Sequence, residues 1–409
     1  MRTSTLSIAA ALGTAAALTL SACGGSSSSG SSSSGSASAS SSSAGAVSAV
    51  CTSPSTISSS GASSSASASG KAPTVPAGSK VGVILPDTTS STRYTLYDAP
   101  LLKQAFDAAG IASDIQNAQG DTSKFQSIAQ SMIGEGVKVL IIDSIDQTSG
   151  AAIEQQAKAA GIKVIDYDRV NLGGSASYYV SFDNEAVGRL QAQTLADCLA
   201  TSGKSNPSVI MMDGGTDVDN NAVLFAKGAN DVLKPLASDK KLTIASETVV
   251  KGWKTANAAP AFTQALTAAN GQVDGVLAAN DDIANAVIGV LQQQGLEGHV
   301  VVTGQDAGVE GLQNILKGTQ TMTIYKDVKT EANAAAQLAI ALIAGQDPAA
   351  SGLKLASGLD PKNPDLKALL LTPQVITQGN VQDVVKAGAL TAAEICNGIQ
   401  QECDAAGVK

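Results

Sequence analysis

From residue 81 onwards, short apolar runs alternate with segments of helical periodicity, and this alternation restricts the fold more than any other feature. The first apolar runs cover residues 81–86, 111–116, 137–142, 162–167 and 178–182, with helical patterns at 122–134 and 149–160. A second round has apolar runs at 209–212, 242–248 and 273–278, with helical patterns at 221–234 and 258–270. Strands alternating with helices of this length predict parallel, doubly wound sheets. We therefore expect an α/β protein with two such units.

Polar residues directly follow several of the predicted strands. The run Val164-Ile165-Asp166-Tyr167 ends in Asp168-Arg169, and the same layout recurs at Asn280-Asp281, at Gln305-Asp306 and at Lys326. A carboxylate accepts from two neighbouring hydroxyls and a guanidinium donates in a fixed fork, so the Asp-Arg pair suits a polyol. Ligands of open α/β sheets bind outside the carboxyl ends of the strands. The pattern indicates a binding protein for a small polyhydroxylated ligand, and a purely structural ion pair is the alternative for Asp168-Arg169.

Composition and missing motifs exclude several other functions. The formal net charge of the 409 residues is -9, which argues against a nucleic-acid partner, and a single His, His299, disfavours His-based catalysis and metal sites. Neither a dinucleotide-binding nor a P-loop glycine pattern follows a strand. Residues 217–221 resemble the start of a calcium loop, but Ala222 replaces the required glycine and Gly228 the final carboxylate. We expect no metal and no cofactor.

The N-terminal part predicts export and a lipid anchor. Arg2 precedes an apolar stretch at residues 6–20, and Leu20-Ser21-Ala22-Cys23 resembles the lipobox of bacterial lipoproteins. An ordinary signal peptide is the alternative. Lipidation at Cys23 would hold the protein at the outer face of the cell membrane. Residues 24–78, of which 24–69 are mostly Ser, Gly and Ala, predict a disordered tether.

The other cysteines leave disulfide pairing open. Cys51 lies in the predicted tether as an unpaired or intermolecular thiol, whereas Cys396 and Cys403 are close enough for a local bridge. Cys198 has the pattern of a buried helix residue.

An ordered set of motifs resembles periplasmic-type sugar-binding proteins of ABC transporters, the type I periplasmic binding proteins, and among them the D-xylose binders. The resemblance covers residues 79–384, and its motifs are Tyr167-Asp168-Arg169, Ser181-Phe182-Asp183-Asn184-Glu185, Val218-Asp219-Asn220-Asn221-Ala222, Gly304-Gln305-Asp306-Ala307, Gly318-Thr319-Gln320-Thr321-Met322-Thr323, Tyr325-Lys326 and Leu370-Leu371-Thr372-Pro373.

The resemblance implies a ligand site and assigns no catalytic residue. The implied site residues are Arg93, Tyr94, Asp168, Arg169, Asp219, Asn221, Trp253, Asn280, Asp306 and Lys326. Tyr94 stands where the xylose binder has a tryptophan, and the loop before Arg93 is rich in Ser and Thr instead of charged residues. Trp253, the only Trp, is the expected platform for the C–H face of a sugar, with ordinary core packing as the alternative.

The same resemblance implies two lobes joined by a three-segment hinge, with the ligand cleft between them. We expect the N-terminal lobe to hold residues 79–182 and 327–371, and the C-terminal lobe 183–326 and 372–409. The chain would cross near Phe182-Asp183, near Lys326 and near Thr372-Pro373.

Three functions are weighed. The first is a monomeric lipoprotein, not an enzyme, that binds D-xylose or a related aldose and delivers it to a membrane permease of an ABC importer. The second is a binding protein of the same fold that takes another sugar or serves a sensor. The third is a glycoside-acting enzyme using Asp168 and Asp306. Neighbouring Arg and Lys side chains would keep both carboxylates ionised, which disfavours the enzyme.

Overall fold

The computed structural model describes residues 75–351 and 353–409. The predicted signal peptide, the lipidation site Cys23, Cys51 and all but the last four residues of the predicted tether lie outside the described residues. Among the described residues, no helix is both long and apolar enough to cross a bilayer.

The first sheet of the described chain has seven strands, and all neighbouring pairs except the β11–β12 edge run parallel. Its order is β11 (Ala356–Ser357), β12 (Lys367–Leu371), β5 (Tyr178–Phe182), β4 (Lys163–Tyr167), β3 (Val139–Ile142), β1 (Lys80–Leu85) and β2 (Ala112–Asn117). The predicted strands are present, with ends that differ by two residues at most. The late strand β12 pairs with β5, so a distant part of the chain completes this sheet.

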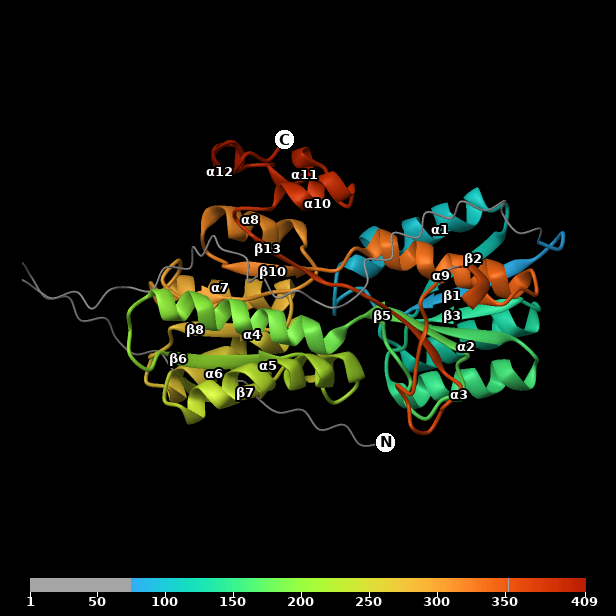
Figure 1. The fold of residues 1–409 in the computed structure, drawn as a ribbon, viewed down its shortest axis with the longest axis horizontal. Helices are drawn as coiled ribbons and strands as arrows, with labels where there is room; N and C mark the ends of the chain where they lie inside the picture. The colour runs from blue at the N-terminus through green and yellow to red at the C-terminus, as the bar shows by residue number, and fades with distance from the viewer. Residues whose placement is uncertain (1–74, 352) are drawn as a thin grey trace, which may run out of the picture. The chain divides into compact units, whose positions relative to one another are not determined.

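Helices cover both faces of this sheet, as Figure 1 shows. They are a π-helical turn η1 (Tyr94–Asp98), α1 (Ala99–Ala108), α2 (Thr122–Gly134), α3 (Gln147–Ala159) and α9 (Val328–Ile343), with a short 3-10 turn η4 (Pro348–Ser351) after α9. Val81 and Val83 pack with α1 and α9 in one buried cluster, whereas Ile84 packs with α2 and α3 in another. Successive side chains of a strand point to opposite faces, so a strand covered on both faces has to be apolar throughout. This explains the uninterrupted apolar runs in the sequence.

The second sheet has the parallel order β7 (Thr243–Val249), β6 (Ser208–Asp213), β8 (Gly275–Ala278) and β9 (Val301–Val302). A separate antiparallel pair joins β10 (Met322–Tyr325) to β13 (Gln374–Thr377). The surrounding helices are α4 (Asn184–Thr201), α5 (Asn220–Ser238), α6 (Ala258–Ala268), α7 (Asp281–Gln293) and α8 (Val309–Lys317), with short 3-10 turns η2 (Lys251–Trp253) and η3 (Thr255–Asn257) before α6. The two doubly wound units predicted from the alternation are confirmed.

Helices α4 and α5 touch through their backbones. A Cβ on Gly188 of α4 would lie 1.9 Å from the carbonyl oxygen of Phe225 in α5, and a Cβ on Gly228 of α5 would lie 2.1 Å from the carbonyl oxygen of Glu185 in α4. No residue larger than glycine fits at either position, so the two helices pack as one unit.

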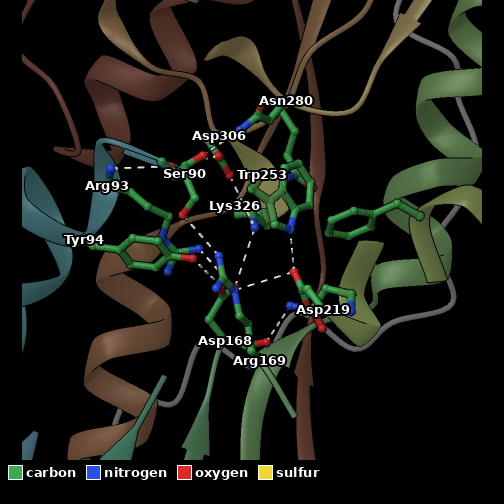
Figure 2. A pocket seen from close by; sticks show the side chains of 14 residues that line it. Ser90, Arg93, Tyr94, Asp168, Arg169, Asp219, Trp253, Asn280, Asp306 and Lys326 are labelled. Carbon is green, nitrogen blue, oxygen red and sulfur yellow. Dashed lines mark hydrogen bonds and ion pairs between the residues drawn. The ribbon is translucent and has the colours of Figure 1, made fainter. Parts of the chain in front are cut away.

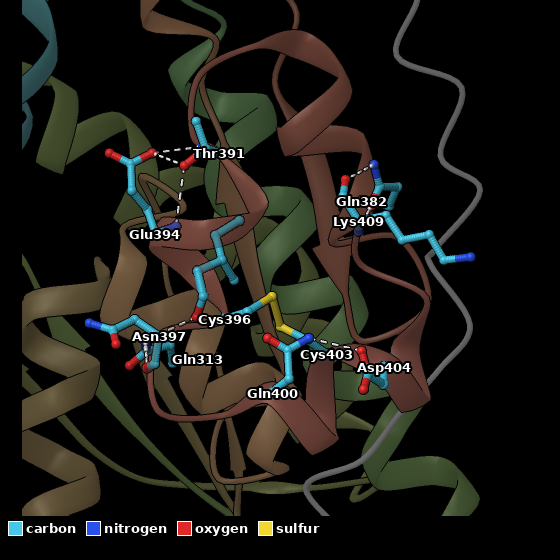
Figure 3. Close-up of a disulfide and its surroundings, with 11 residues drawn as sticks. Gln313, Gln382, Thr391, Glu394, Cys396, Asn397, Gln400, Cys403, Asp404 and Lys409 are labelled. Atoms are coloured by element: carbon cyan, nitrogen blue, oxygen red, sulfur yellow. Dashed lines mark hydrogen bonds between the residues drawn. A yellow bond between two sulfur atoms is a disulfide. The ribbon is translucent and has the colours of Figure 1, made fainter.

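The C-terminal segment forms three short helices, α10 (Gln382–Ala387), α11 (Ala392–Ile395) and α12 (Gln400–Ala406). A disulfide between Cys396 and Cys403 closes the turn between α11 and α12, a pairing that the sequence had left open (Figure 3). Gln313 of α8 donates to the carbonyls of Ile395 and Asn397 and so holds this segment against α8. Cys198 is buried in α4, as predicted, and is disulfide-bonded.

Candidate functional site

The ten predicted site residues line one cavity (Figure 2). They reach it from the ends of strands and the starts of helices. Asp168 follows β4, Asn280 caps α7, Asp306 follows β9 and Lys326 follows β10. The cavity therefore lies at the carboxyl ends of the strands of both sheets, where ligands of open α/β sheets bind.

Asp168 sits at the centre of the charged network. Its carboxylate accepts from Arg93 Nη1 at 3.3 Å and from the hydroxyl of Tyr94 at 3.1 Å, and Lys326 Nζ lies 3.7 Å away. Burial alone would raise the pKa of Asp168, but the positive charges of Lys326, Arg93 and Arg169 outweigh burial and lower this pKa to about 2. Asp168 is therefore ionised at neutral pH, as the sequence led us to expect.

The backbone at Asp168 is unusual. This residue has a left-handed φ of 58°, and the amide of Arg169 donates to the carbonyl of Tyr167 at 2.7 Å. A bond from residue i+2 to residue i closes a γ-turn, and a positive φ at a central residue other than glycine is uncommon. Such backbone strain concentrates at functional sites.

Arg169 does not pair with Asp168 in the described part of the chain. Its Nε lies 3.5 Å from Asp219 and 3.7 Å from Asp143, while Nη1 donates to the carbonyl of Ser144 and Nη2 to the hydroxyl of Ser90. Burial and these partners hold the guanidinium in one position, with its carbon 5.6 Å from the centroid of the Tyr94 ring. The close ionic partners of Asp168 and of Arg169 are therefore other groups, and not each other.

Two guanidinium groups lie near the ring of Tyr94. The carbon of the Arg93 guanidinium is 5.7 Å from its ring centroid, close to the distance found for Arg169. Cations at these distances interact favourably with the electron-rich face of an aromatic ring. Tyr94 thus contributes its hydroxyl to Asp168 and its ring to the placement of both arginines.

Trp253 lines the cavity and also belongs to a buried hydrophobic cluster. Its side chain is buried, its ring meets Phe225 edge-on at 6.3 Å, and its Nε1 donates to Asp219 at 3.0 Å. The indole lies directly on the backbone after β6, where a Cβ on Gly214 would come within 2.1 Å of the ring. Gly214 therefore leaves the space that the indole occupies.

Four further described residues line the cavity that were not among the predicted site residues: Ser90, Ser91, Phe225 and Gln305. Asp87 shapes the loop of residues 88–92, here called the serine loop, because its carboxylate accepts from the amides of Thr89 and Ser90. The Asx-turn pattern of Asp followed by Thr and Ser was the available signal for this loop.

The serine loop also contacts the second sheet. The carbonyl of Ser90 accepts from Asn280 Nδ2 at 3.1 Å, and the hydroxyl of Ser91 donates to Asp306 at 3.1 Å. Lys326 lies 3.3 Å from Asp306. Segments that follow strands of the first and of the second sheet therefore meet in direct polar contacts around the cavity.

Comparison with known proteins places this geometry in a family. The model of the periplasmic binding protein domain matches residues 81–347. The chain belongs to this family. A D-xylose-binding periplasmic protein of Escherichia coli (strain K12) is 37% identical over 299 residues, which cover 73% of this chain and 87% of that relative.

Two further relatives of this periplasmic binding protein extend the comparison. The multiple sugar-binding periplasmic receptor ChvE of Rhizobium radiobacter is 32% identical and covers 77% of this chain and 91% of its own length. The crystal structure of a carbohydrate transporter solute binding protein from Chloroflexus aurantiacus, in complex with D-glucose, superposes with a TM-score of 0.69 at 30% identity, over 77% of this chain and 97% of that one. The predicted type I periplasmic binding protein fold is confirmed, and the chain is a family member of the sugar-binding transport type.

Proposed function

We propose that this protein binds D-xylose or a related neutral aldose and delivers it to the permease of an ABC importer. The observation that carries the proposal is the balance of charge in the cavity. Among its described lining residues, Arg93, Arg169 and Lys326 face Asp168, Asp219 and Asp306. Each positive group lies within 4 Å of at least one of these carboxylates. A balanced set of donors and acceptors suits the hydroxyls of an uncharged sugar, each of which donates and accepts.

The energetics favour such a ligand. Hydrogen bonds to charged groups contribute about 1.5–3 kcal/mol each, and a micromolar site needs about -8 kcal/mol net. A sugar would replace part of the contacts that the side chains make with one another, so the net gain is smaller than the sum of its hydrogen bonds. The rings of Trp253 and Phe225 supply the apolar wall that the C–H face of a sugar requires.

The two sheets correspond to two proposed lobes that close over the sugar. We place the crossings near Phe182-Asp183, near Lys326 and near Thr372-Pro373, and the lobes at residues 79–182 with 327–371 and at 183–326 with 372–409. Closure would be a hinge motion at these segments. The lipobox-like Leu20-Ser21-Ala22-Cys23 supports an exported protein that is anchored by a lipid to the outer face of the membrane.

A thermal-shift panel of pentoses and hexoses, followed by calorimetry, tests the proposal. A ligand that binds only the folded state raises the melting temperature. D-Xylose or a related aldose should give the largest shift and a stoichiometry of one sugar per chain. A panel in which no neutral sugar shifts the transition would refute the proposal.

A second candidate is a receptor for several sugars or for a sensor partner. Tyr94 in place of the tryptophan expected of a xylose binder, together with the uncharged serine loop, favours a site that accepts more than one aldose. Similar shifts with D-xylose, D-glucose and other aldoses would support it. Release of phenol from aryl glycosides would instead indicate the glycoside-acting enzyme.

A further inference from the structure

The carbonyl oxygen of Asp168 accepts an unusual number of hydrogen bonds. Three donors from the described residues converge on it: the hydroxyl of Tyr179 at 2.9 Å, the hydroxyl of Ser181 at 2.8 Å and Nδ2 of Asn221 at 2.7 Å. A carbonyl has two lone pairs, so three close donors saturate it. All three side chains are buried.

The donors come from both sides of the first proposed crossing. Tyr179 and Ser181 point from the same face of β5, which ends at Phe182, whereas Asn221 lies in the first turn of α5. Asn184, the first residue of α4, donates to Asn221 Oδ1 at 2.9 Å. Because Gly188 and Gly228 let α4 and α5 touch, Asn184 and Asn221 are carried by one rigid helix pair.

The hydroxyl of Tyr179 links these groups. It lies 3.0 Å from Asn221 Oδ1 as well as 2.9 Å from the Asp168 carbonyl, and it accepts from Asn184 Nδ2 at 3.3 Å. One hydroxyl proton serves two acceptors, so loss of this hydroxyl leaves both with fewer donors in a buried place. Tyr179 and Ser181 are not among the residues that line the cavity.

We propose that Tyr179 and Ser181 are positioning residues: together with Asn221 they clamp the Asp168 carbonyl, hold Asp168 in its left-handed conformation and so aim its carboxylate at the sugar. A left-handed non-glycine residue persists only where its surroundings over-determine it. The three donors are that restraint, and the carboxylate they aim is the one that meets Arg93, Tyr94 and Lys326. The proposal deepens the proposed sugar-binding function and rests on it for its effect on affinity.

The test removes the hydroxyls and measures sugar affinity by calorimetry with D-xylose and D-glucose. Tyr179→Phe is expected to weaken binding roughly 5- to 150-fold, the range for a buried hydrogen bond whose partner is left unsatisfied. Tyr178→Phe is the matched control, because it removes a hydroxyl from the adjacent residue on the opposite face of β5, and its affinity should equal that of the unaltered protein. Equal affinity of Tyr179→Phe and the control would overturn the proposal.

A double-mutant cycle distinguishes positioning from general destabilisation. If Tyr179 acts through Asp168, then Tyr179→Phe should cost clearly less affinity in an Asp168→Asn background than in the unaltered protein. An equal factor in both backgrounds would show that Tyr179 acts independently of Asp168, against the proposal.

Hydrogen exchange provides a readout that needs no sugar. The peptide containing Asp168 and Arg169 should exchange faster in Tyr179→Phe/Ser181→Ala than in the unaltered protein, while peptides of α2 and α3 stay unchanged. Unchanged exchange at Asp168-Arg169 would refute the clamp. If the unaltered protein binds no sugar in the panel, the proposed function fails, and the exchange rates still decide whether the clamp exists.

Discussion

Gly214→Ala should disturb the sugar site through the indole of Trp253, although Gly214 carries no side chain of its own. A Cβ at this position would lie 2.1, 2.3 and 2.4 Å from three ring carbons of Trp253. Carbon atoms in contact are separated by roughly 3.5–4.0 Å, so the ring has to withdraw by about 1.5 Å. Such a shift is enough to break the 3.0 Å hydrogen bond from Trp253 Nε1 to Asp219.

Two costs follow from this displacement. Overpacking a buried site lowers the free energy of unfolding by about 1–3 kcal/mol. Loss of a hydrogen bond to a carboxylate costs about 1.5–3 kcal/mol, which corresponds to roughly 10- to 150-fold in affinity if it falls entirely on sugar binding. We therefore expect Gly214→Ala to fold with reduced stability, to bind sugar at least tenfold more weakly and to change the emission of the single tryptophan.

Denaturant unfolding, calorimetry and tryptophan emission test this expectation, with Gly289→Ala as the control. Gly289 lies inside α7, and a Cβ there would have no atom within 4 Å. Alanine in a helix interior is more favourable than glycine by about 0.5–1 kcal/mol, so this variant should be slightly more stable and bind sugar normally. If Gly214→Ala keeps both its affinity and its emission, the indole is not held by the backbone at Gly214 and the reasoning is wrong.

Four other predictions concern charge, stacking, pH and anchoring. Arg169→Ala should weaken sugar binding by about 2–5 kcal/mol, measured by calorimetry, because it leaves Asp219 unpaired in a buried site, and normal binding would remove Arg169 from the site. Trp253→Ala should weaken sugar binding in a protein that still folds. In the unaltered protein, emission from Trp253 should change on addition of the aldose, in step with binding measured by calorimetry. Tight binding with constant emission would contradict stacking of the sugar on Trp253. Burial raises the pKa of Asp281 from 3.8 to about 8, so the folded state keeps a proton that the unfolded state releases. Its contribution to stability is therefore complete below about pH 4 and is lost as the pH rises through 8. The unfolding free energy of Asp281→Asn should accordingly fall less steeply between pH 5 and 8.5 than that of the unaltered protein. An equally steep fall in both proteins would argue against a proton held by Asp281. Cys23→Ala should move the protein from the membrane fraction to the medium, and continued membrane association with an intact signal peptide would place the anchor elsewhere.

The fold was predictable because a parallel strand that is buried on both faces appears in the sequence as an uninterrupted apolar run. The runs that became β1 and β3 are apolar at every position in contact with helices, and their residues divide between two clusters by simple alternation. The three short C-terminal helices have no such mark, because segments of four to seven residues show too little periodicity to be recognised.

The candidate site was predictable as far as side-chain type and strand position allowed. Asp168, Arg169 and Lys326 could be found because they are charged residues directly after apolar runs. The contributions of Gly214 and of the Asp168 carbonyl could not be found in this way. They depend on close approach of backbone atoms and on a left-handed conformation, which neither composition nor periodicity records.

The contacts of the serine loop with Asn280 and Asp306 influence the affinity for all sugars equally, and so do not influence the selectivity between sugars. The bonds from Asn280 to the Ser90 carbonyl and from Ser91 to Asp306 join protein groups to one another. They favour the same arrangement of the two sheets whichever sugar is bound. Their contribution to the binding free energy therefore has the same size for every sugar. Changes in this loop that spare the cavity-lining atoms would rescale all dissociation constants by a single factor and leave their ratios intact. Changes confined to these two contacts would therefore adjust the working concentration range of such a receptor without changing which sugar it prefers.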